Sequence, residues 1–137
     1  IMGKYLAVAV IGAALPAGAA WAEGDADRGA ALYAQHCAAC HGADGKGDGP
    51  ASPALAARAP DLTQLARHNG GTFPAAEVEK AIRGEADVAA HGSSEMPIWG
   101  RALYDARPDA KPGRRYGLAQ LRIRALTAYV ESIQASE

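Results

Sequence analysis

Residues 37–41 read Cys-Ala-Ala-Cys-His, and the spacing within this pentapeptide decides how the rest of the sequence is interpreted. Positions three and four apart share one face of a helical turn. Cys37 and Cys40 can therefore reach two vinyl groups of one porphyrin and form thioethers, while His41 points its imidazole at the iron from the same side. This pattern is the attachment signature of a c-type haem.

Two other chemistries use paired cysteines, and the remaining sequence disfavours both. A redox-active dithiol of the thioredoxin kind needs a βαβ context, but the chain has no alternating strand pattern of useful length. A structural zinc site needs four ligands, but the sequence holds only two cysteines. The motif therefore predicts one haem, bound covalently through Cys37 and Cys40.

Composition and charge restrict the class of protein further. The chain has 137 residues and no obvious repeat, which fits one domain plus a targeting segment. Its 14 Lys and Arg against 15 Asp and Glu give a net charge of −1, which disfavours nucleic-acid binding. An excess of Ala, with one Phe and few Val and Ile, favours helices over sheets. A small domain with so few large apolar residues has a small hydrophobic core, and a bound group is expected to complete that core.

The N-terminus has the pattern of a secretory signal peptide. Lys4 precedes an apolar stretch over 5–15, and small residues follow up to Ala-Trp-Ala at 20–22. A positive start, a short apolar run and an A-x-A end predict cleavage between Ala22 and Glu23. The expected organisation is a signal peptide over 1–22 and one domain over 23–137.

Retention of this segment as a membrane anchor is the alternative. Residues 5–22 number 18, which is at the lower edge of what spans a bilayer. Pro16 and the many Ala and Gly residues make the segment a weak span. Contact with a membrane is therefore expected only if residues 5–22 are retained.

Capping and turn signals divide the rest of the chain into helices and loops. Asp25 is a suitable N-cap for the first helix, and the Gly- and Pro-rich run over 42–53 indicates a loop. Apolar residues at three- and four-residue spacing predict the last helix. The expected helices are 26–40, a short one opened by Asp61 and stopped at Gly70, 74–83 ended by Gly84, and 118–133, with 84–117 mostly loop.

The first expected helix resembles that of monohaem class I cytochromes c of the bacterial periplasmic type. In that family a Gly and an aromatic residue precede the haem motif at the intervals of Gly29 and Tyr33 from residues 37–41. The run His-Gly-x-x-Gly-x-Gly-x-Gly-Pro over 41–50 is also similar to bacterial members. The resemblance covers essentially all of the chain after residue 22.

The resemblance implies an all-α fold in which the N- and C-terminal helices cross and loops wrap one covalently bound haem. In the family the two helices approach closely at the Gly, which explains a flexible residue within a helix despite its cost. The expected contacts of Gly29 on the last helix are Leu126 and Tyr129.

The family also suggests residues around the haem. A Pro after the motif accepts a hydrogen bond from the proximal imidazole, which fixes the tautomer and plane of the ring. Pro50 fits this role best, and Pro53 is the alternative. An aromatic residue beyond the sixth ligand often packs at the haem edge and binds a propionate, so Trp99 is expected either to do so or to pack without that bond. Arg101 is either a charge partner of a propionate or a solvated side chain.

The sixth iron ligand is expected to be Met96. It is the only Met after residue 22, and Met-Pro is the usual ligand context in the family. Met96 follows His41 by 55 residues, which is enough chain to wrap the haem and return on its distal face. The alternatives are that Met96 fills a core gap or that His91 binds the iron. His36 and His68 are less well placed.

The resemblance implies an electron-transfer protein rather than an enzyme. A periplasmic carrier would move one electron between redox partners, either membrane complexes of a respiratory chain or a periplasmic dehydrogenase. One alternative is a fixed subunit of a larger oxidoreductase complex, tethered by residues 5–22. Another is a haem enzyme that acts on peroxide or a gas, which needs a weak or absent sixth ligand; Met96 disfavours it.

Charge is divided unevenly along the chain. Residues 23–100 carry 6 positive and 11 negative side chains, whereas residues 101–137 carry 7 positive and 4 negative ones. Solvated surface on both halves is the simpler interpretation. The alternative hypothesis is that the uneven charge gives the molecule an electric dipole, which orients it when it meets a charged partner.

Overall fold

The computed structural model describes residues 17–55, 57–85, 97 and 99–136, and these residues form helices and loops without a strand. This confirms the predicted all-α class. Within the same residues, no helix has the length and apolar character needed to cross a bilayer. The elements are α1 Ala17–His36, α2 Ala38–His41, the 3-10 turns η1 Ser52–Ala54 and η2 Leu62–Gln64, α3 Leu65–His68, α4 Ala75–Arg83, α5 Trp99–Asp105 and α6 Pro112–Ser132.

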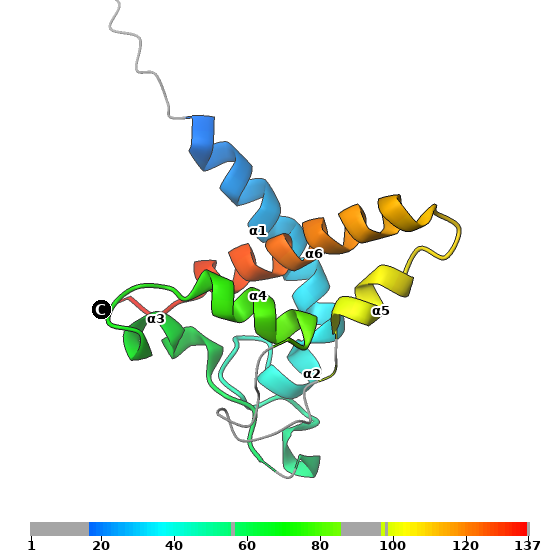
Figure 1. The fold of residues 1–137 in the computed structure, drawn as a ribbon. Coiled ribbons are helices and arrows are strands. Elements are labelled where there is room, and N and C mark those ends of the chain that lie inside the picture. Colours follow the sequence, from blue (N-terminus) through cyan, green and yellow to red (C-terminus); the bar gives the residue numbers. More distant parts are fainter. Residues whose placement is uncertain (1–16, 56, 86–96, 98, 137) are drawn as a thin grey trace, which may run out of the picture.

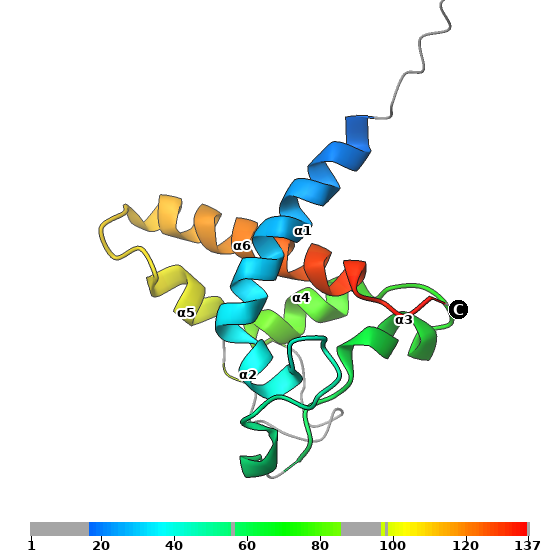
Figure 2. The same ribbon diagram turned by 180° about the vertical axis from the view of Figure 1, so that it is seen from behind.

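The first and last long helices cross in the middle of the molecule, and Gly29 makes the close approach possible (Figures 1 and 2). A Cβ atom at Gly29 would overlap the carbonyl oxygen of Ala125 and lie 2.7 Å from Cβ of Tyr129. The rings of Tyr33 and Tyr129 are 4.9 Å apart beside the crossing. The predicted crossing and the contact with Tyr129 are confirmed, but the other residue nearest to Gly29 is Ala125 and not the expected Leu126, which is buried in the adjoining core.

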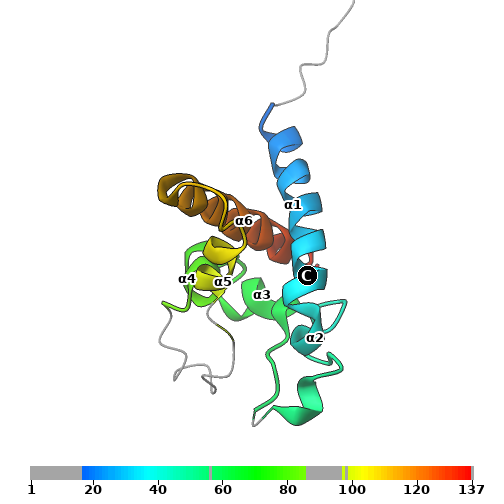
Figure 3. The ribbon, with the colours of Figure 1, turned by 90° about the vertical axis from the view of Figure 1, so that its right-hand side faces the viewer.

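The shorter helices α4 and α5 pack against α6 and extend the core away from α1 (Figure 3). Ile82 of α4 and Leu103 of α5 join Ile123 and Leu126 of α6 in one buried cluster. Tyr33 of α1 belongs to the same cluster. The core is small. A cavity lies next to it, below the helix crossing, and residues of these helices form part of the cavity wall.

The helix boundaries differ from the predicted ones at both ends of the chain. The first helix begins at Ala17, so Asp25 lies inside α1 and is not its N-cap. It ends at His36, and α2 continues it after a junction at which the amide of Cys37 still donates to the carbonyl of Tyr33 at 2.8 Å. The side chain of Asp61 accepts a hydrogen bond from the amide of Thr63, so its predicted capping role is confirmed.

The expectation that residues 84–117 are mostly loop is wrong for two segments. Helix α5 lies within this range, and α6 begins at Pro112, earlier than the predicted 118. Polar contacts between the two helices order them: Arg115 forms an ion pair with Asp105 at 3.8 Å and lies over the ring of Tyr104. Arg122 donates to the carbonyl of Leu103 at 3.0 Å. These contacts join residues from two helices, so local composition did not reveal them.

Candidate functional site

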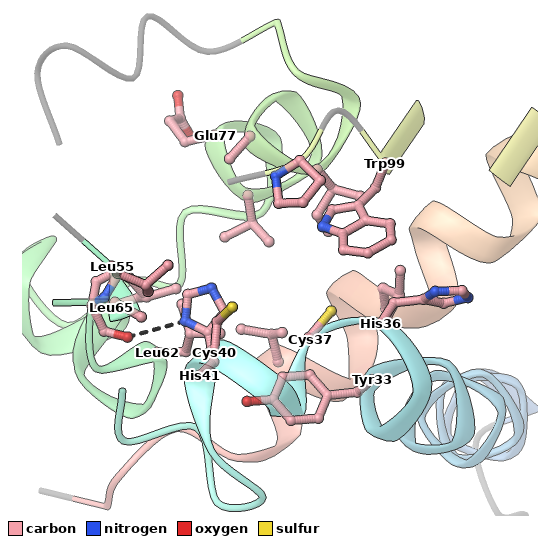
Figure 4. Close-up of a pocket in the computed structure, with 18 of the residues that line it drawn as sticks. Tyr33, His36, Cys37, Cys40, His41, Leu55, Leu62, Leu65, Glu77 and Trp99 are labelled. Atoms are coloured by element: carbon pink, nitrogen blue, oxygen red, sulfur yellow. Dashed lines mark hydrogen bonds between the residues drawn. The ribbon is translucent and has the colours of Figure 1, made fainter. Parts of the chain in front are cut away.

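A cavity of about 250 Å³ lies below the helix crossing (Figure 4). Its walls come from the end of α1, from α2, from the segment around Pro60, from α4 and α6, and from the start of α5. Aliphatic side chains make up most of the lining, so the hollow disfavours water and charge. Six of them are Leu62, Leu65, Val78, Ile82, Leu126 and Val130.

The pentapeptide forms one wall of this cavity. Within it the amides of Cys40 and His41 donate to the carbonyl of Cys37 at 3.1 and 2.9 Å, which winds residues 37–41 into a helical turn. Figure 4 shows the two sulfur atoms and the imidazole on the same side of the hollow, facing Trp99 and Glu77 across it. The structure therefore brings together the three predicted attachment residues.

The surroundings of His41 favour a neutral imidazole with a fixed orientation. The side chain is 7% exposed, and burial lowers the pKa of its imidazole, partly opposed by a backbone hydrogen bond. Nδ1 donates to the carbonyl oxygen of Pro60 at 3.2 Å, the dashed line in Figure 4. Because Nδ1 carries the proton, the lone pair of Nε2 is left free to bind a metal.

The expectation that Pro50, or alternatively Pro53, accepts from the proximal imidazole is wrong, because Pro60 occupies that position. The amides of Gly49 and Ala51 donate to carbonyls of Cys40 and Ala39, so the loop carrying Pro50 folds back along the backbone of α2. Pro50 is exposed there. The chain returns to the imidazole only at Pro60.

The thiol of Cys37 has the wrong chemistry for a redox-active dithiol. Burial, together with the charge of Cys40 nearby, raises its pKa to about 11. Reactive dithiols need the opposite shift, because the thiolate is the nucleophile. In the described part of the chain no three His, Cys, Asp or Glu side chains come close enough to hold a metal ion by themselves. The raised pKa of Cys37 therefore disfavours a redox-active dithiol.

Met96 and its alternative His91 lie outside the described residues. Pro97 and Trp99, which follow Met96, both line the cavity. The rings of Trp99 and His36 are 5.1 Å apart, and His36 also lines the cavity. Trp99 therefore lines the cavity, while its packing at the haem edge and its bond to a propionate stay predictions.

The cationic side chain at the cavity is Arg58, which the sequence interpretation missed. Among the described lining residues it is the only Arg or Lys, and its Nε donates to the carbonyl of Gly47 at 3.4 Å. Arg101 is 80% exposed and forms an ion pair with Asp105 at 2.6 Å, which favours its interpretation as a surface residue. Arg58 lies among Ala and Pro residues, so nothing in the local sequence marks it.

These features define the class of the protein: a small all-α protein with a covalent attachment site for one porphyrin. The aliphatic hollow, the paired sulfurs and the neutral imidazole fit a haem in both shape and donor chemistry. The family model Cytochrome c matches residues 26–134, and the chain belongs to this family. Its cofactor is one haem c, attached through Cys37 and Cys40. Neither the curated proteins nor the solved structures contain a match to the chain.

Proposed function

We propose that this member of the cytochrome c family is a periplasmic carrier that moves one electron at a time between a donor and an acceptor protein. When bound, the haem supplies a one-electron ferrous–ferric couple. The observation that carries the proposal is the apolar cavity into which the buried, neutral His41 projects. An electron-transfer role itself follows from the family.

The residues around the cavity suit a carrier with both axial positions filled. The carbonyl of Pro60 orients the His41 ring, and the aliphatic lining raises the potential by disfavouring the extra charge of the ferric form. Met96 is proposed as the sixth ligand. Its neighbour Pro97 lines the cavity, which supports this assignment.

Two alternatives share the same site. In a fixed subunit of a larger oxidoreductase complex, residues 5–22 would remain as a tether and the partner would be permanent. In a haem enzyme acting on peroxide or a gas, the sixth position would be open or easily displaced. The proposed partners are membrane complexes of a respiratory chain or a periplasmic dehydrogenase, and the predicted export signal supports a partner in that compartment.

The free-carrier proposal predicts a mature N-terminus at Glu23. The small residues Ala20 and Ala22 fit the preference of the signal peptidase. Intact-mass measurement of holoprotein purified from its host should therefore give residues 23–137 plus one haem. A mass that includes Trp21 with haem bound would favour the tethered subunit instead.

The charge division predicts salt-dependent docking. The α5–α6 end, where exposed Lys111 and Arg114 lie, concentrates the positive side chains. Electron transfer to an oppositely charged partner should slow between about 10 mM and 150 mM salt, as the Debye length falls from about 30 to 8 Å. Stopped-flow rates for the parent and for Arg114→Gln would test this, with a smaller salt effect in the variant. Rates that stay flat in the parent would rule out the dipole hypothesis.

A further inference from the structure

The side chain of Gln134, just beyond the end of α6, ties the C-terminus to the wall that carries Pro60. Its Nε2 donates to the carbonyls of Leu62 at 2.7 Å and Val130 at 2.8 Å, and its Oε1 accepts from the amide of Ala66 at 2.9 Å. Two partners accept and one donates, so only this orientation of the amide satisfies all three. Figures 1 and 2 show the C-terminal tail beside α3 in both views.

The side chain of Gln134 supplies hydrogen bonds at the start of α3 that residues next to α3 in the sequence do not supply. Gln64, the residue before α3, makes no capping bond with its side chain. Ala66 lies in the first turn of α3, where backbone N–H groups lack partners within the helix. The amide of Ala135 adds a bond to the carbonyl of Thr63 at 2.8 Å. The segment 62–66 is therefore held mainly from the far end of the chain.

A short run of residues links this segment to the imidazole, because Pro60, which accepts the bond from His41, lies two residues before Leu62. The carboxylate of Asp61 accepts from both the amide and the hydroxyl of Thr63, which stiffens the short path between Leu62 and Pro60. The amide of Leu62 also donates to the carbonyl of Gly45, in the loop after the haem motif, at 2.7 Å. The position of the Pro60 carbonyl, and hence its bond to His41, depends on where this segment is held.

From these contacts we infer that Gln134 is a positioning residue for the proximal histidine and tunes the reduction potential through Pro60. A hydrogen bond from Nδ1–H makes the imidazole a more basic ligand, and a more basic ligand stabilises ferric iron. Removing the tie lets the 62–66 segment shift and weakens the bond to Pro60. The potential then rises. The inference rests on the proposed role of His41 as iron ligand, but not on Met96 or on the cellular location.

The test compares Gln134→Leu with a matched change on α6 itself. Gln120 accepts a bond from Arg83 of α4 at 2.9 Å, so Gln120→Leu also removes a tie between α6 and a cavity wall, but not the wall that carries Pro60. Both variants should lose some stability as holoproteins. Only Gln134→Leu should raise the reduction potential. Only this variant should also speed exchange of the His41 ring N–H, and the exchange rate should rise roughly three- to tenfold for the loss of about one net hydrogen bond.

Identical potentials and identical ring N–H exchange in Gln134→Leu and the parent would overturn the inference and leave Gln134 a purely structural residue. If Gln134→Leu yields no holoprotein, Gln134→Glu carries the comparison. It keeps the acceptor for Ala66 but loses the donor to Leu62. Because its carboxylate lowers the potential by its charge alone, the readout for this variant is exchange of the His41 ring N–H: an increase smaller than in Gln134→Leu supports the inference, and no increase overturns it. Failure of the proposed function would instead appear in the parent, as a haem without His41 as a ligand.

Discussion

Replacing Met96 by alanine is expected to open the distal face of the haem and to lower the reduction potential by on the order of a tenth of a volt, within the roughly 0.8 V range that axial ligands span. A thioether sulfur favours ferrous iron, and its loss removes that preference. The reduced variant should bind carbon monoxide readily. The variant should still fold, because Cys37 and Cys40 keep the haem attached. Potentiometry and optical spectra of parent and variant measure these changes.

Two further variants separate Met96 from its alternative. Met96→His should keep a six-coordinate low-spin haem at a lower potential than the parent. His91→Ala should leave the spectrum of the parent unchanged. If His91→Ala instead opens the distal site, or Met96→Ala leaves spectrum and potential as they were, His91 is the ligand.

Gly29→Ala is expected to destabilise the holoprotein by about 1–3 kcal/mol, the usual cost of overpacking a close contact. The added Cβ would overlap the carbonyl oxygen of Ala125 and press on Tyr129, so the α1–α6 crossing must widen. Widening it disturbs Tyr33 and Leu126, which also line the haem cavity. The midpoint of denaturant unfolding should fall accordingly.

Gly117→Ala is the matched control, since a Cβ at Gly117 would meet no atom within 4 Å. There the gain in helix propensity should act alone, and the variant should be more stable by about 0.5–1 kcal/mol. If Gly29→Ala is stabilised like Gly117→Ala, the two helices do not approach as closely as the structure shows.

The haem-attachment wall was predictable because its signal is local. Cys37, Cys40 and His41 lie within one helical turn, and helical geometry alone places them on one face. The crossing at Gly29 was predictable only through the family resemblance. The hydrogen-bond partner of the imidazole was not predictable. Loop 42–51 folds back along α2, so Pro60 is the first proline whose carbonyl reaches the imidazole.

Tertiary contacts also explain why the sequence did not reveal the helices within 99–117 or the roles of Arg58 and Gln134. Residues 99–117 have the composition of a loop, but Asp105, Arg115 and Arg122 order them through contacts between α5 and α6. Arg58 reaches the cavity because the segment around Ala59 packs on Gly47, where a Cβ would overlap the carbonyl oxygen of Ala59. Gln134 likewise bonds to residues far away in sequence. Propensity and periodicity describe neighbours along the chain and carry no information on such pairs.

Exposure of the reduced parent holoprotein to carbon monoxide tests most directly whether the protein is an electron carrier with both axial positions filled. With His41 and Met96 both bound, the spectrum of the reduced protein should not change, and the oxidised protein should show the near-infrared sulfur-to-iron band. Rapid formation of a carbon monoxide adduct by the parent, or absence of that band, would contradict Met96 ligation; a rapid adduct would favour a haem enzyme with an open site.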